Sequence, residues 1–191
     1  MLKKYVILTI SYGFEMCNDA KWRKSNSAER IHQLLLQSDA LTSQETGVIP
    51  TRDFKTTQNL VSCGETYELY SSTSITATFS LTSQCPHYIN RLLFEPAHNP
   101  AYLRRIAFSS ECFESSMYQG LAFYRLLRFV VETCRQKHVD VVRAEINPTL
   151  SSLSKAMFLF GFSEVTCKFH DGLYNKQYLN LKLRDLPRSI K

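Results

Sequence analysis

The residues with the clearest chemical potential lie where a polar loop meets a predicted helix. A strand is predicted to end at Phe108, a polar loop follows it, and Gly120-Leu121-Ala122 opens an amphipathic helix. A helix start offers free backbone N–H groups and the positive end of the helix dipole, which together bind phosphate or pyrophosphate. The small side chain of Ala122 would let a cofactor approach the backbone. The pattern predicts a phosphate-binding turn, although glycine also begins helices that bind nothing.

Other catalytic patterns are missing from the sequence. The five histidines form no HxxxH or HxH group and the six cysteines form no CxxC pair, so we expect no metal site. No Gly-x-Ser-x-Gly nucleophile elbow occurs. The cysteines are widely and irregularly spaced, and a chain of this length does not need disulfides. We therefore expect free thiols and a cytoplasmic protein.

Composition and charge narrow the class of protein. The chain has 191 residues, of which 44% are hydrophobic and 21% charged, so we expect one globular domain over residues 1–191. The net charge of +6 suits an anionic partner, such as a phosphate-bearing cofactor or an acidic carrier protein, and equally serves solubility. The densest basic cluster, at residues 21–24, is too short for a nucleic-acid arm. We therefore expect no nucleic-acid partner. No apolar run is long enough for a transmembrane helix, so we also expect no membrane span.

Apolar periodicity predicts the elements that must position the phosphate-binding turn. Residues 26–29 have the spacing of a capping box and predict a helix start, whereas residues 42–57 are typical of a long loop that holds at most one helical turn. Two further helices are predicted near residues 120–138 and 150–160. Alternation and apolar runs predict strands at residues 5–10, 67–70, 75–81, 102–108, 139–146, 165–169 and 178–183; at residues 5–10 a strand is favoured over a faint signal-peptide pattern. This order predicts an α/β or α+β fold with helices packed on a sheet.

The order of these pieces resembles the GNAT superfamily of acyl-CoA-dependent N-acyltransferases. The segments that carry the resemblance, within about residues 65–183, are Arg105-Ile106-Ala107-Phe108, Gln119-Gly120-Leu121-Ala122, Glu145-Ile146-Asn147-Pro148 and Leu159-Phe160-Gly161-Phe162. The resemblance implies a mixed, mostly antiparallel central sheet with helices on both faces. It also implies a fourth and a fifth strand that splay apart.

The resemblance also implies a set of cofactor contacts. The arm of an acyl-pantetheine would lie between the two splayed strands and pair with backbone groups of Ile106, Ala107 and Phe108. The pyrophosphate would meet the N–H groups of the segment that opens the helix, namely Gln119, Gly120, Leu121, Ala122 and Phe123. Asn147 would contact the pantetheine arm or the acceptor. The implied co-substrate is acetyl-CoA or another acyl-CoA, and the implied acceptor is a small-molecule or peptide amine; homodimers are common in the superfamily.

Acid and base candidates follow from the same comparison. An attacking amine must lose a proton, often through water to a carboxylate, and Glu111 and Glu145 are the candidate bases. Each of them also fits a solvated or salt-bridged carboxylate. Met157 stands where many members have a tyrosine general acid, and Met117 stands where an Arg or Gln usually precedes the glycine turn. Tyr118 is a replacement acid, or else a tyrosine that packs in the loop.

Three functions therefore compete. The first is transfer of an acyl group, acetyl by default, from a thioester to a primary amine. The second is an N-acyl amino acid synthase or acyl-homoserine-lactone synthase that takes its acyl chain from acyl carrier protein, because residues 75–81, 92–95 and 104–109 resemble the layout of those enzymes. The third is a binding module that keeps the fold without catalysis.

Overall fold

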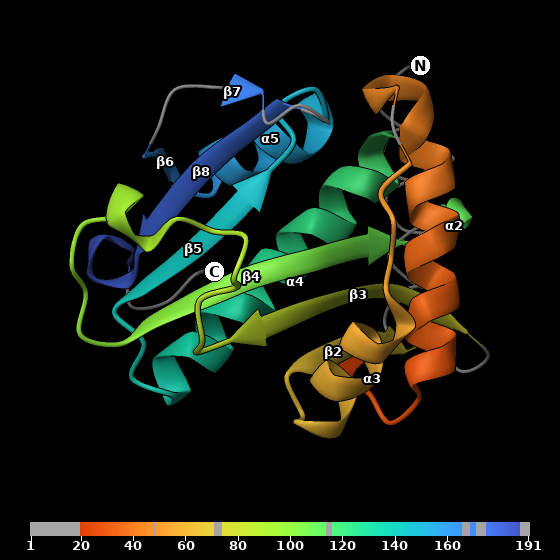
Figure 1. The fold of residues 1–191 in the computed structure, drawn as a ribbon, viewed down its shortest axis with the longest axis horizontal. Coiled ribbons are helices and arrows are strands. Elements are labelled where there is room, and N and C mark those ends of the chain that lie inside the picture. The colour runs from red at the N-terminus through yellow and green to blue at the C-terminus, as the bar shows by residue number, and fades with distance from the viewer. Residues whose placement is uncertain are drawn as a thin grey trace, which may run out of the picture.

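The computed structural model describes residues 20–47, 49–70, 74–113, 116–165, 169–170 and 175–187 (Figure 1). The strand expected at residues 5–10 lies outside these residues. Within them, two helices follow the first strand, three strands come next, and two further helices flank the fifth strand before the last three strands; the strands join in one central sheet.

The central sheet is mixed and mostly antiparallel, as the sequence predicts. Its strands are β1 (Lys21–Lys24), β2 (Thr66–Tyr70), β3 (Ile75–Thr82), β4 (Pro100–Phe108), β5 (Val141–Ile146), β6 (Ser163–Glu164) and β8 (Asn175–Lys182), in the spatial order β1-β2-β3-β4-β5-β8-β6. The short β7 (Phe169–His170) pairs with β8. Only β4 and β5 run parallel among the described pairs. A parallel pair needs a crossover, and here a long helix supplies it.

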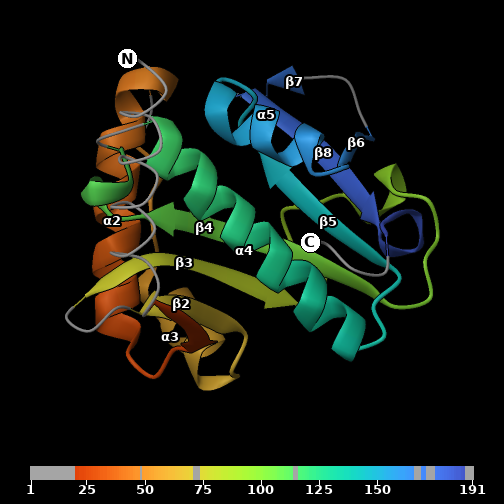
Figure 2. The ribbon, with the colours of Figure 1, turned by 180° about the vertical axis from the view of Figure 1, so that it is seen from behind.

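Helices cover both faces of the sheet. They are α2 (Ala28–Thr46), α3 (Phe54–Ser62), α4 (Ser116–Gln136) and α5 (Ser151–Leu159), with short 3₁₀ turns η1 (Arg91–Leu93), η2 (Ser110–Phe113) and η3 (Leu183–Asp185). Figures 1 and 2 show α4 and α5 behind the sheet and α2 and α3 in front of it. The apolar stripe of α4, from Phe123 to Cys134, packs into the main core together with β2, β3, β4, β5 and β8. The α/β architecture with helices on both faces is therefore confirmed.

The expected loop at residues 42–57 is wrong in part. The preceding helix, α2, starts as predicted with Ser27 as its cap, but it continues to Thr46 and ends at Gly47, whose φ of 71° is left-handed. A further helix, α3, begins after Asp53, whose carboxylate accepts the backbone N–H groups of Lys55 and Thr56. Sequence periodicity missed α3 because this short helix buries only Thr57 and Leu60 and therefore has little apolar stripe.

The basic cluster at residues 21–24 forms the edge strand β1. Its Arg23 Nε donates a 2.7 Å hydrogen bond to Glu68 of β2, and the hydroxyl of Ser25 donates another 2.7 Å bond to the same buried carboxylate. A charged edge strand resists pairing with other chains, and this explains why β1 lacks the apolar alternation of the inner strands.

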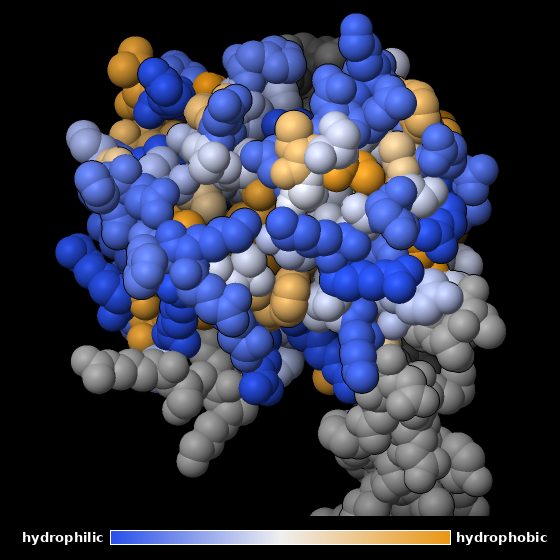
Figure 3. Space-filling model, turned by 90° about the horizontal axis from the view of Figure 1, so that it is seen from below, coloured by the Kyte–Doolittle hydropathy of each residue, from blue (hydrophilic) through white to orange (hydrophobic). Residues whose placement is uncertain are grey.

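The face of the molecule that Figure 3 shows is largely polar. Seen from below, hydrophilic side chains dominate the described part of the molecule and hydrophobic ones are scattered among them (Figure 3). Scattered hydrophobic residues are normal on a folded protein and mark no docking face on this side.

Truncating the core beneath α4 should destabilise the fold. Leu127 on α4 is 1% exposed, so Leu127→Ala should lower the free energy of unfolding by about 2–5 kcal/mol through lost packing and a cavity. The matched control is Leu92→Ala in η1, because Leu92 is 92% exposed and should change stability by less than about 0.5 kcal/mol. Urea unfolding measures both, and equal losses would contradict this placement of the core.

Candidate functional site

The strands β4 and β5 pair over only part of their length. Their register runs from Pro100 opposite Val141 to Leu103 opposite Ala144 and then stops. Beyond that point β4 continues to Phe108 and β5 continues to Ile146, but the two strands no longer pair with each other. Figure 1 shows the tips of the two arrows diverging, so the predicted splay of the fourth and fifth strands is confirmed. We call the opening between these two strand ends the gap.

A bulge in β4 lies beside the gap. Thr78 of β3 pairs with Ala107 and Ser80 pairs with Arg104, so Arg105 and Ile106 together face the single residue Phe79. Arg105 adopts a left-handed φ of 55°. Bulges leave one residue out of the strand ladder and redirect the groups around it. Of the three residues expected to meet an acyl arm, Ile106 is therefore in the bulge, while Ala107 and Phe108 are buried and paired with β3.

The helix α4 begins earlier than expected. The sequence predicts a start near Gly120, but the helix starts at Ser116, so that prediction is wrong by about one turn. Helical N–H groups bond to the carbonyl four residues earlier, and only those of the first turn stay free. Gln119 therefore lies in this first turn, whereas the N–H groups of Gly120, Leu121, Ala122 and Phe123 lie within the helix ladder. The side chain of Tyr118 lies outside the described part of the chain, so its expected role as an acid stays a prediction.

The start of α4 still faces the gap. In the view from behind, the N-terminal end of α4 lies near the open end between the tips of β4 and β5 (Figure 2). Ala122 packs against the main core and Phe123 is buried in it, stacking edge-on with Phe108 at a ring distance of 4.5 Å. This contact ties the first turns of α4 to the end of β4.

The two candidate bases lie on elements at opposite sides of the gap. Glu111 is exposed on η2, directly after β4. Glu145 lies on β5, one residue beyond the last pair with β4, and its side chain is 11% exposed. Its Oε1 is 3.4 Å from Nζ of Lys176 on β8, whose side chain is 9% exposed. Glu145 therefore has a nearly buried carboxylate held by a lysine, and Glu111 has a solvated one.

Asn147 lies at the end of β5, and Met157 lies in the main core. Asn147 comes directly after β5, and its side-chain oxygen accepts hydrogen bonds from the backbone and hydroxyl of Thr149 at 3.0 Å and 2.7 Å. This turn ends β5 and occupies the carboxamide oxygen. Met157 is completely buried in the main core, so it offers no proton to a leaving group.

A group of basic residues that the sequence analysis did not single out also lies here. Arg105 Nη2 donates to the hydroxyl of Thr57 at 2.5 Å, and burial lowers the pKa of Arg105 to about 10, with the charges of Arg52 and Arg104 adding to the effect. Arg52 in turn binds Asp39 through two bonds of 2.6 Å and 2.7 Å. The sequence signal that could have identified this group is the pair Arg104 and Arg105, two consecutive arginines inside an otherwise apolar strand.

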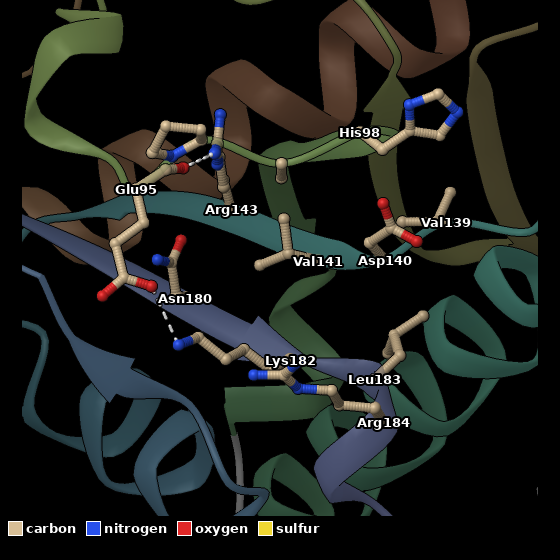
Figure 4. A pocket seen from close by; sticks show the side chains of 12 residues that line it. Glu95, His98, Val139, Asp140, Val141, Arg143, Asn180, Lys182, Leu183 and Arg184 are labelled. Carbon is tan, nitrogen blue, oxygen red and sulfur yellow. Dashed lines mark hydrogen bonds and ion pairs between the residues drawn. The ribbon is translucent and has the colours of Figure 1, made fainter.

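A hollow of about 410 Å³ lies at the other end of β5 (Figure 4). It is lined by the start of β5, the end of β8 and residues 95–98. An ion pair of 2.9 Å between Lys182 and Glu95 crosses it, and Arg143 Nη2 donates to the Glu95 carbonyl at 2.6 Å. Because the gap opens beyond Ala144 whereas this hollow surrounds Val141, the two lie at opposite ends of the strand.

The described residues contain neither a metal-binding cluster nor a membrane-spanning helix. Within the described residues, no group of three or more His, Cys, Asp or Glu side chains is arranged to hold a metal ion. Among the described residues, Cys63, Cys85, Cys112 and Cys134 form no disulfide bond. No helix in the described ranges has the length and hydropathy needed to cross a bilayer.

The fold is similar to solved structures of N-acyltransferases. FeeM, an N-acyl amino acid synthase from uncultured soil microbes, is 13% identical over 87% of this chain and 91% of its own, with a TM-score of 0.64. A GNAT-family acetyltransferase from Streptococcus agalactiae is 13% identical over 86% and 96%, with a TM-score of 0.65. The NatC complex bound to Gag peptide and CoA is 10% identical over 86% and 98%, with a TM-score of 0.61. Searches of protein-family models and of curated proteins found no match.

These likenesses define the class of fold. The chain has the GNAT fold, along nearly the whole length of the structures it matches. The splayed strands, the bulge and the crossover helix are the parts of that fold that surround the gap.

Removing the lysine that holds Glu145 should destabilise the protein. We expect Lys176→Met to lower the free energy of unfolding by about 1–4 kcal/mol, because a nearly buried carboxylate loses its partner. Lys155→Met, on the exposed side of α5, is the matched control and should change stability by less than about 0.5 kcal/mol. Adding Glu145→Gln to Lys176→Met should restore part of the loss in urea unfolding. A double variant no more stable than Lys176→Met would contradict the pairing.

Proposed function

We propose that the chain is an N-acyltransferase of one domain that moves an acyl group, acetyl by default, from acyl-CoA to a primary amine. The observation that carries this proposal is the gap: two parallel strands that part after Leu103 and Ala144, with a bulge on one of them and a helix start at the open end. The likeness to acyltransferase structures, one of them bound to CoA, supports it.

The gap suits an extended thioester arm. Residues 104–108 of β4 lack a partner strand on the side of β5, so their backbone groups are available to a ligand that lies like a strand. We assign Ile106, Ala107 and Phe108 to this arm, and the first turn of α4 up to Gln119 to the pyrophosphate. Gly120, Leu121 and Ala122 then form the surface beneath the phosphates, with Phe123 buried behind them, and Asn147 borders the arm from β5.

The reaction needs few groups from the protein. The amine nitrogen bonds to the thioester carbonyl carbon, the carbon–sulfur bond breaks, and an amide and a thiolate form. A backbone N–H at the bulge would stabilise the charge that develops on the carbonyl oxygen. Glu145 or Glu111 takes the proton that the amine loses. Because Met157 cannot donate, Tyr118 or water returns a proton to the thiolate.

A carrier-protein donor is the second candidate. It is favoured by the likeness to FeeM over 87% of this chain and by the net charge of +6, which suits an acidic carrier protein. This candidate keeps the gap and the amine chemistry and differs only in what holds the pantetheine arm. The third candidate, a binding module without turnover, is favoured by the buried methionine at position 157.

Acyl-CoA binding tests the gap directly. Titration calorimetry with acetyl-CoA should give micromolar affinity, and Gly120→Glu should weaken it about tenfold or more, because a carboxylate would face the phosphates. A Cβ at Gly120 meets nothing within 4 Å, so the matched variant Gly120→Ala should fold and bind as the unmodified protein does.

The same titration separates the candidates. A long-chain acyl-CoA or an acyl carrier protein that binds more tightly than acetyl-CoA would select the carrier-protein candidate. Binding without turnover over a broad panel of amines would select the binding module. If neither thioester binds, the proposed function is wrong.

Glu145 and Glu111 can be separated by kinetics. If Glu145 is the base, Glu145→Gln should lower kcat by about 10²–10⁴-fold while the Kd for acyl-CoA is unchanged, because only the proton transfer is lost. Glu111→Gln is the matched variant, and the reverse pattern would assign the base to Glu111. Two fully active variants would exclude both carboxylates.

A further inference from the structure

Arg104 lies beside Glu145 on one face of the sheet. Leu103 and Ala144, the last pair of β4 and β5, both belong to the main core under α4. Successive side chains of a strand point to opposite faces, so Arg104 and Glu145 both point to the face that carries α2 and α3. They are the first positions after the two strands part, and the side chain of Arg104 therefore borders the gap next to a candidate base.

Arg104 has no carboxylate partner among the residues that the structure describes. No ion pair joins Arg104 or Arg105 to an acid among the described residues, and the buried Nε of Arg104 has no hydrogen-bond partner there. Its guanidinium lies 5.7 Å from the ring centre of Tyr88. A half-buried cation without a counter-ion is costly for a protein to keep.

The other charges nearby cancel in pairs. Arg52 is matched by Asp39 at 2.6 Å, and Lys176 by Glu145 at 3.4 Å. Within the described part of the chain, Arg104 and Arg105 are therefore the excess positive charge on this side of the gap. The lowered pKa of Arg105 has the same origin, since burial and the neighbouring arginines both disfavour its charge.

We propose that the acceptor is an amine that also carries an anionic group, a carboxylate or a phosphate, and that Arg104 binds this group with Arg105 beside it. This inference rests on the proposed acyl transfer and names its acceptor class. The anionic group supplies the charge that Arg104 lacks, and guanidinium groups bind both carboxylates and phosphates through paired hydrogen bonds. The amine then lies next to Glu145, one strand away.

The same charges help the amine to react. An ammonium group close to Arg104 and Lys176 loses its proton more readily, because like charges disfavour the protonated form. A simple alkylammonium without an acid group would be repelled and would gain nothing in return. The site therefore selects amines by their anionic group and also activates them.

Matched acceptors test this proposal with acetyl-CoA as the donor. Amino acids are compared with the amines that lack their carboxylate, and 2-aminoethyl phosphate is compared with ethanolamine. We expect kcat/KM to favour the anionic member of at least one pair by about tenfold or more. The pair that shows the preference tells carboxylate from phosphate.

Variants of Arg104 assign the preference to this residue. Arg104→Met should remove the preference, by lowering kcat/KM for the anionic amine about tenfold or more relative to the amine that lacks the acid group, with the Kd of acetyl-CoA unchanged. Arg104→Lys should keep part of it, because the charge remains. Arg91→Met, an exposed arginine of η1, is the matched control and should keep the full preference.

Several results would overturn the inference. The first is equal kcat/KM for the amines with an anionic group and for the matched amines that lack it. Loss of acetyl-CoA affinity in Arg104→Met, with unchanged acceptor preference, is another, since it would place Arg104 on the donor. If no amine is acylated, the proposed function fails, and calorimetry with the acceptors alone decides the inference. Binding of anionic amines that depends on Arg104 would then support it, and no such binding would refute it.

Discussion

The short parallel pairing of β4 and β5 is the constraint on which the site depends. Four residue pairs join the two strands, ending at Leu103 and Ala144, and no other described ladder links the β1–β4 half of the sheet to the β5–β8 half. Backbone pairing between the two half-sheets is therefore confined to this short segment. The main core under α4 contains residues of both halves, so burial of its apolar surface also joins the two half-sheets.

This arrangement explains why the two faces beside the gap differ. Toward α4 the side chains of both strands are apolar and buried, because the crossover helix must bind both halves. Toward α2 and α3 the same strands carry Arg104, Arg105 and Glu145. The bulge reinforces the contrast, since it adds one residue to β4 and places Arg105 against Thr57 of α3. Apolar packing on one face thus positions polar chemistry on the other.

The sequence predicted the elements whose pattern comes from burial. Alternation in β3 and the apolar stripe of α4 were sufficient because one face of each is in the core. The edge strand β1 and the short helix α3 were missed, since both are mostly polar and are held by specific contacts, such as those of Glu68 and Asp53. The start of α4 was misplaced by a turn because a glycine does not by itself mark the first residue of a helix.

The candidate site was harder to predict than the fold, for a physical reason. Glu145 could be named from its strand, but its partner Lys176 lies 31 residues later and meets it only because β8 pairs with β5. Lys176 and Glu145 thus meet on one face of the sheet, which the pattern of neither strand alone predicts. The proposed acceptor site adds Arg104 to this pair, because Arg104 lies on the same face of the neighbouring strand β4. Three strands, β4, β5 and β8, therefore supply the residues of the proposed site, and only their pairing in space brings these residues together.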